Sequence, residues 1–186
     1  MLVDEKYFAP KTPASVIAVG DAFEALLIRS MLESLGAAVL LHLVGTPEDF
    51  LLTLERKEHD PKLVVICGHG DENGLVFGDY GDGVDVGALV DGSLPAAAIA
   101  KRARMPGAIV VSTACLTGDT AFAKAFLEAG AAAYIAPSDC PDASDAALFA
   151  HYLFHSLLRR GLSPERAFDR ARHADPALDM FRLHKP

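Results

Sequence analysis

Short apolar runs alternate with segments of helical periodicity along this chain of 186 residues. The runs are continuous rather than alternating with polar residues, which is typical of strands buried on both faces. Helices between buried strands predict a parallel sheet with right-handed crossovers and helices on both sides. The expected fold is therefore a three-layer α/β/α sandwich with a mainly parallel sheet. The expected strands span residues 15–20, 37–45, 63–68, 108–115 and 131–137.

Capping residues mark where the helices begin. Asp21 is a candidate N-cap after the first strand, and Thr46 followed by Pro47 has the residue types that start the next helix. The length favours one core, so we expect a single domain over residues 1–186 with residues 1–14 as an extended leader. Further helices are expected over residues 94–105, 119–130, 143–160 and 164–174.

A glycine-rich and acidic excursion separates the third strand from the next helix. It runs from about residue 71 to residue 93, and "GLVFG" within it predicts one arm of a hairpin. Asp79, Asp82 and Asp85 lack the ordering and the terminal Glu of an EF-hand loop. We interpret this segment as a solvated loop near the mouth of a site.

Charge and composition exclude several classes of protein. A net charge of -8 at pH 7 and a pI near 5.3 do not provide the basic surface that nucleic-acid binding needs. No apolar stretch reaches the roughly 18 residues of a membrane span, and the N-terminus lacks the apolar core of a signal peptide. Cys67, Cys115 and Cys140 are widely spaced, which suits a reducing compartment. We expect a cytoplasmic protein that binds neither nucleic acid nor membranes.

Two expected strands end in reactive side chains. The third runs into His69 and Gly70, and the fourth ends at Cys115. If these strands are neighbours, their backbones lie about 4.8 Å apart, at the sheet edge where open α/β folds bind ligands. An imidazole there can accept the proton of a thiol during nucleophilic attack. The backbone N–H groups of Gly70 and Cys115 can then stabilise the oxyanion.

Two stretches carry a family resemblance. "LVVICGHGDENGLVFG" and "GAIVVSTACLTGDTAFAKAFLEAGAAAYIAP" resemble the caspase-like cysteine peptidases of clan CD, most of all their CHAT-type and gingipain-like bacterial members. The similarity covers residues 63–174. It implies a caspase-like fold, His69 as general acid/base and Cys115 as nucleophile. It also implies that a peptide bond is cleaved through a thioester acyl-enzyme.

The same resemblance suggests substrate-binding positions. Some relatives that cut after basic residues place an acidic side chain two positions before the nucleophile, whereas this chain has Thr113, so the resemblance does not predict a preference for Lys or Arg. Ser138 and Asp139 follow the fifth strand, where relatives line the pocket for the residue before the scissile bond. The expected substrate is a protein or peptide, and a homodimer or a partner in a larger system is compatible with the sequence.

Other kinds of site fit less well. A zinc site formed by Cys67, His69 and Cys115 has no evident fourth ligand. His151 and His155 lack the adjacent Glu of a zincin helix, so we expect no metal and no cofactor. The remaining alternative is a catalytically inactive caspase-like module that binds a protein partner or a small ligand at the strand-end cleft. Faster alkylation of Cys115 than of the other cysteines would favour the enzyme.

Overall fold

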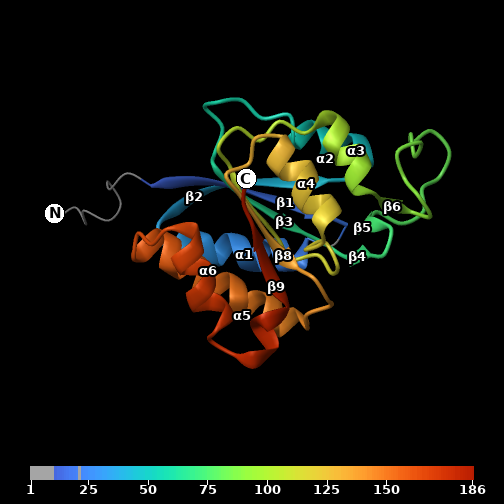
Figure 1. Ribbon diagram of the computed structural model, residues 1–186. Coiled ribbons are helices and arrows are strands. Elements are labelled where there is room, and N and C mark those ends of the chain that lie inside the picture. The colour runs from blue at the N-terminus through green and yellow to red at the C-terminus, as the bar shows by residue number, and fades with distance from the viewer. Residues whose placement is uncertain (1–10, 21) are drawn as a thin grey trace.

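The computed structural model describes residues 11–20 and 22–186. A six-stranded sheet forms its centre, in the order β2-β1-β3-β7-β8-β9 (Figure 1). The first five strands in that order are parallel, and β9 pairs antiparallel with β8. The predicted mainly parallel sheet is therefore confirmed. The strands are β1 (Thr12–Val19), β2 (Ala37–Val44), β3 (Leu63–Cys67), β7 (Ile109–Ser112), β8 (Ala133–Pro137) and β9 (Phe181–His184).

Helices cover both faces of the sheet (Figure 1). One face carries α2 (Pro47–Thr53), α3 (Ala96–Arg102) and α4 (Thr120–Glu128). The other carries α1 (Phe23–Ser34), α5 (Ala143–Phe154) and α6 (Pro164–Arg172). Alternate strand residues such as Val64 and Val65 belong to two separate apolar clusters, one on each side of the sheet. The three-layer sandwich is thus confirmed.

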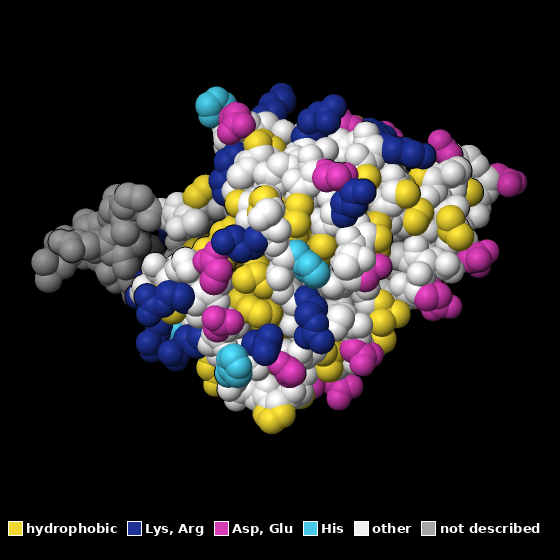
Figure 2. All heavy atoms as spheres, in the orientation of Figure 1, with side chains coloured by type: hydrophobic (Ala, Val, Ile, Leu, Met, Phe, Trp, Pro, Cys, Tyr) yellow, Lys and Arg dark blue, Asp and Glu magenta, His cyan; other side chains and the backbone are white. Residues whose placement is uncertain are grey.

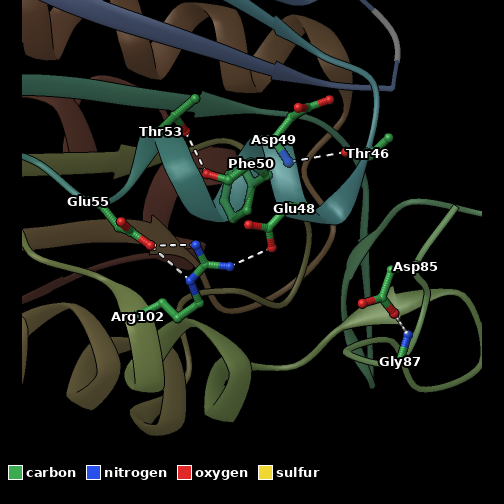
Figure 3. Close-up of polar contacts among 9 residues, drawn as sticks. All are labelled: Thr46, Glu48, Asp49, Phe50, Thr53, Glu55, Asp85, Gly87 and Arg102. Carbon is green, nitrogen blue, oxygen red and sulfur yellow. Dashed lines mark hydrogen bonds and ion pairs between the residues drawn. The ribbon is translucent and has the colours of Figure 1, made fainter.

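Polar contacts cap a helix and hold α2 and α3 together. The Thr46 hydroxyl accepts a hydrogen bond from the Asp49 amide at 3.1 Å, as expected of an N-cap. Arg102 of α3 pairs with Glu48 of α2 and with Glu55, which ties the two helices together (Figure 3). Asp21, the other predicted N-cap, lies outside the described residues. Within the described part of the chain, no helix is long and apolar enough to cross a membrane.

Strand β2 differs from the prediction of a fully buried strand. It lies at the edge of the sheet, where Leu40 and Leu43 are 54% and 66% exposed. An apolar composition does not distinguish an edge strand from a central one, because both pack at least one face against helices. Strand β1 begins at Thr12, three residues before the predicted start, and residues 1–10 lie outside the described residues.

Strand β9 was not predicted. It has only four residues, too few to show a periodic pattern. Its first residue, Phe181, is fully buried and stacks on Phe149 of α5 with ring centroids 3.7 Å apart. A 3-10 helix (Pro176–Met180) precedes it, and a π-helical turn (His155–Arg159) extends α5.

A small second sheet stands at the carboxyl end of the main one. It consists of β4 (Gly70–Asp71), β5 (Gly74–Val76) and β6 (Ser93–Leu94), all antiparallel. The predicted hairpin arm at "GLVFG" is therefore confirmed. Figure 1 shows this sheet beyond the ends of β1 and β3, beside the segments that follow the central strands.

Candidate active site

Strands β3 and β7 are neighbours, as the site prediction requires. They pair in parallel with Val64 opposite Val110 and Ile66 opposite Ser112. The Thr113 amide donates to the Ile66 carbonyl at 3.0 Å, which extends the pairing by one residue. The chain therefore leaves both strands at the same edge of the sheet, and the segments that hold His69 and Cys115 begin next to each other.

The turn that holds Cys115 is fixed by hydroxyl groups. β7 ends at Ser112, three residues before the predicted end, and the Ala114 amide donates to the Ser112 hydroxyl at 3.2 Å instead of to a neighbouring strand. The Thr117 hydroxyl donates to the Ala114 carbonyl at 2.8 Å and lies 3.0 Å from the Ser112 hydroxyl. The buried Tyr134 hydroxyl donates to the Thr117 carbonyl at 2.8 Å. Cys115 therefore sits in a tight turn rather than on a strand.

The turn is also held by the last strand and by α4. A ring nitrogen of His184 in β9 lies 2.9 Å from the Gly118 carbonyl oxygen. Asp119 caps α4 by accepting from the Phe122 amide at 2.8 Å, so the helix begins where the sequence predicts. The two ends of the turn are thus anchored to different elements.

Gly70 brings the histidine segment against the cysteine segment. A Cβ atom at Gly70 would lie 2.1 Å from the carbonyl oxygen of Cys115 and 3.3 Å from its amide nitrogen. Only glycine permits such an approach. On the other side, the Val76 amide donates to the His69 carbonyl at 3.0 Å, which fixes His69 to the hairpin. The two predicted oxyanion-hole residues, Gly70 and Cys115, therefore have their backbones in contact.

His69 and Cys115 line one pocket of about 240 Å³. The two residues therefore border the same cavity, together with residues from the starts of α1 and α5. The described residues contain no hydrogen bond between these two side chains. The rest of the lining comes from the same strand ends, from the start of α1 and from the start of α5: Phe23, Glu24, Gly68, Thr113, Pro141, Ala143 and Ala146.

Glu24 is a site residue that the sequence interpretation missed. Its Oε2 accepts a hydrogen bond from the hydroxyl of Thr113 at 2.8 Å, within the same pocket. The position of α1 explains this, because the helix follows β1 and β1 pairs with β3. The sequence does contain one signal for this residue. Glu24 lies in the first turn of the helix that follows β1, and β1 is the neighbour of β3, the strand that precedes His69. Thr113 itself is nearly buried, with 5% of its surface exposed.

The three cysteines differ in environment. Cys67 is fully buried, and burial, together with the charge of Glu24, raises the pKa of its thiol. Burial also raises the pKa of Cys115 to about 11, and the neighbouring Cys140 thiol contributes to this shift. Cys140 is exposed. Among the described residues, no group of three or more His, Cys, Asp or Glu side chains could hold a metal ion.

Ser138 and Asp139 do not line the pocket that holds the cysteine. The Ser138 hydroxyl donates to the Met180 carbonyl at 2.9 Å and borders a neighbouring pocket of about 480 Å³, which Leu116 also lines. The Asp139 carboxylate accepts from the Cys140 amide at 2.8 Å. Their role in substrate binding stays a prediction.

The hairpin, the sheet order and the strand-end pocket together define a caspase-like α/β fold. No family model and no curated protein sequence matches the chain. Among solved structures, the Arg-specific cysteine proteinase gingipain R matches with a TM-score of 0.62 and 15% identity, over 94% of this chain and 46% of that one. The Saccharomyces cerevisiae separase in its complex with securin matches with a TM-score of 0.61 and 14% identity, over 94% of this chain and 12% of that one.

A second gingipain structure, the complex of the pro- and mature domains of RgpB from Porphyromonas gingivalis, gives a TM-score of 0.60 at 13% identity, over 94% of this chain and 47% of that one. The chain therefore spans less than half the length of the proteinases it matches. At these identities the similarity shows the fold alone, which is that of clan CD cysteine proteases. The predicted caspase-like fold is thereby confirmed, and the CHAT-type likeness stays a prediction.

Proposed function

We propose that this protein is a cysteine endopeptidase in which Cys115 is the nucleophile and His69 the general acid/base. One observation carries the proposal: His69 and Cys115, which follow two neighbouring strands, line a single pocket beside a glycine that brings their backbones together. The fold shared with clan CD proteases supports it. The motifs that resemble CHAT-type and gingipain-like bacterial members belong to the same proposal.

The reaction proceeds by acyl transfer. His69 accepts the thiol proton of Cys115 as the sulfur attacks the scissile carbonyl carbon. The Gly70 and Cys115 amides stabilise the oxyanion of the tetrahedral intermediate. His69 then donates the proton to the leaving amine, which breaks the peptide bond and leaves a thioester. Water hydrolyses the thioester with His69 as the base, which frees the Cys115 thiol.

The pocket selects a basic side chain for the residue before the scissile bond. Glu24 supplies a carboxylate in the pocket, held by the Thr113 hydroxyl, and a carboxylate binds an ammonium or guanidinium group by charge-assisted hydrogen bonds. Figure 2 shows further Asp and Glu side chains on the side of the molecule that holds β4, β5 and β6, which favours the approach of a cationic peptide. Gingipain R, a protein of this fold, is Arg-specific.

A second candidate is a binding module without catalysis. It is favoured by the pKa of Cys115, which burial and Cys140 raise to about 11, and by the lack of a hydrogen bond between His69 and Cys115 in the described residues. In this case the pocket binds a basic peptide through Glu24 and releases it uncut.

Digestion of an unbiased peptide library distinguishes the two. The endopeptidase should cut after Lys or Arg, and Cys115→Ala should lower the rate by about a thousandfold or more. Thermal unfolding of the variant checks that it folds. Glu24→Gln should weaken cleavage after Lys or Arg, and Glu33→Gln is its matched control, because Glu33 lies on the same helix but pairs with Arg29 on the surface. Binding of Lys and Arg peptides with no cut that depends on Cys115 would replace the enzyme with the binding module.

A further inference from the structure

The proposed nucleophile has a second thiol beside it. Both cysteines are free, and the turn that holds Cys115 contacts the segment that holds Cys140. They come from different elements, since Cys115 follows β7 and Cys140 stands between β8 and α5. Cys140 is exposed, whereas Cys115 is partly buried. An oxidant from solvent therefore meets Cys140 first.

Backbone contacts hold the two segments together on both sides of the thiols. The Leu116 amide donates to the Asp139 carbonyl at 3.3 Å, so the residue after Cys115 is joined to the residue before Cys140. Two residues further along, the Gly118 amide donates to the Pro137 carbonyl at 2.7 Å. A Cβ atom at Gly118 would lie 2.6 Å from the Ala136 carbonyl oxygen, so this approach also requires glycine. The pair of thiols is therefore a fixed feature of the site.

We propose that Cys115 and Cys140 form a reversible disulfide when the protein meets a peroxide, and that this bond switches the site off. The disulfide follows from the placement of the two thiols alone. The switch rests on the proposed function, because it matters only if Cys115 is the nucleophile. A sulfur bonded to Cys140 cannot attack a carbonyl carbon, and Pro141, next to Cys140, lines the same pocket.

The chemistry takes two steps. The Cys140 thiolate attacks one oxygen of hydrogen peroxide, the O–O bond breaks, and the products are a sulfenic acid and hydroxide, which a proton converts to water. The Cys115 sulfur then attacks the Cys140 sulfur and expels hydroxide, which takes the thiol proton and leaves as a second water. Both sulfurs are oxidised and the peroxide is reduced. Exchange with a dithiol returns the two free thiols.

The test is peptide mapping of the full chain after treatment with hydrogen peroxide. Trypsin cuts at Arg104, Lys124 and Arg159, so Cys115 and Cys140 fall in different peptides. We expect a linked pair of these peptides, lighter by two hydrogens than the separate ones, that disappears after reduction with dithiothreitol. Cleavage activity should fall in proportion to the linked fraction and return on reduction.

Two variants make the test decisive. Cys140→Ser should form no linked peptide in peroxide. Cys115→Ser should form no linked peptide either, whereas Cys67, buried in the core, should appear in no linked peptide in any sample. Peroxide that gives only sulfinic or sulfonic acid, with no linkage, would overturn the proposal. Cleavage that persists in fully linked protein would overturn the switch.

The disulfide proposal and the peptidase proposal can fail independently of each other. If the reduced chain shows no cleavage that depends on Cys115, the peptidase proposal fails, yet the linked peptide still decides the disulfide. If cleavage is present and the linked peptide is absent, the peptidase stands and the disulfide is wrong.

Discussion

The two ends of the central sheet both carry a pocket, and the larger pocket is at the end without the proposed chemistry. At the amino ends of the strands, Thr12, Leu63 and Ile109 line a space of about 640 Å³ together with Leu157 and Leu158. At the carboxyl ends, the pocket with His69 and Cys115 measures about 240 Å³. Size therefore does not identify the site in this fold.

The two pockets differ in which chain segments line them. At the carboxyl ends, three successive strands lead into segments that converge: Glu24 after β1, His69 after β3 and Cys115 after β7. At the amino ends, the chain enters the strands from separate crossovers, and none of the lining residues is a cysteine. The contrast teaches that parallel neighbours assemble reactive groups where they end.

The largest difference between the two ends should appear when one histidine at each end is replaced by alanine. His69→Ala should lower kcat/KM by about a hundred- to ten-thousandfold, because the general acid/base is lost. His59→Ala, at the amino-end pocket, should leave it unchanged. Steady-state kinetics on a peptide cut by the natural chain measures both. Equal effects of the two variants would mean that His69 is not the proton-transfer group.

A second test concerns the close approach at Gly70. Gly70→Ala adds a methyl group where the Cys115 carbonyl already lies, so the backbone must move and the oxyanion donors separate. We expect kcat to fall by about a hundredfold and thermal stability to drop. Gly81→Ala is the matched control, since nothing lies within 4 Å of a Cβ atom there. An unchanged kcat for Gly70→Ala would remove Gly70 from the oxyanion hole.

A third test sharpens the specificity assigned to the carboxyl-end pocket. Glu24→Gln keeps the shape of the side chain and removes its charge, so kcat/KM for Lys and Arg substrates should fall by about ten- to a hundredfold. Peptides with a neutral residue at that position should be cut as before. Competition between matched peptides reports the ratio directly. A uniform loss for all peptides would make Glu24 a structural residue.

The smallest effect is on the pH dependence of labelling. Burial and Cys140 raise the pKa of Cys115 to about 11, so its thiolate is scarce at neutral pH and increases as the pH rises. Alkylation of Cys115 by iodoacetamide should accelerate steadily from neutral to strongly alkaline pH. In Cys140→Ser the sulfur partner is lost, and the profile should move to lower pH. A profile that Cys140→Ser leaves in place would mean that burial alone sets this pKa.

Much of the fold follows from local patterns. The continuous apolar runs predict the central strands because β1, β3, β7 and β8 are buried on both faces, and the caps at Thr46 and Asp119 follow from residue type. The exposure of β2 and the existence of β9 depend on which neighbour each strand receives. That choice is made by tertiary packing, such as the stacking of Phe181 on Phe149, which a four-residue segment does not reveal.

The candidate site likewise contains residues that the sequence predicts and residues that only the packing reveals. His69 and Cys115 were predictable because each follows a recognisable strand, and the sheet order then brings the strands together. Glu24 was not, because its place in the pocket depends on how α1 packs after β1. The neighbourhood of Cys140 was hidden for a related reason: it follows from the hydrogen bond between Leu116 and Asp139.

The contact between His184 and the Gly118 carbonyl has a consequence for biosynthesis. The ribosome delivers β9 long after the hairpin, the central strands and the cysteine turn. A growing chain lacks this anchor until residue 184 has emerged, so the contact that holds the turn around Cys115 forms only after β9 has left the ribosome.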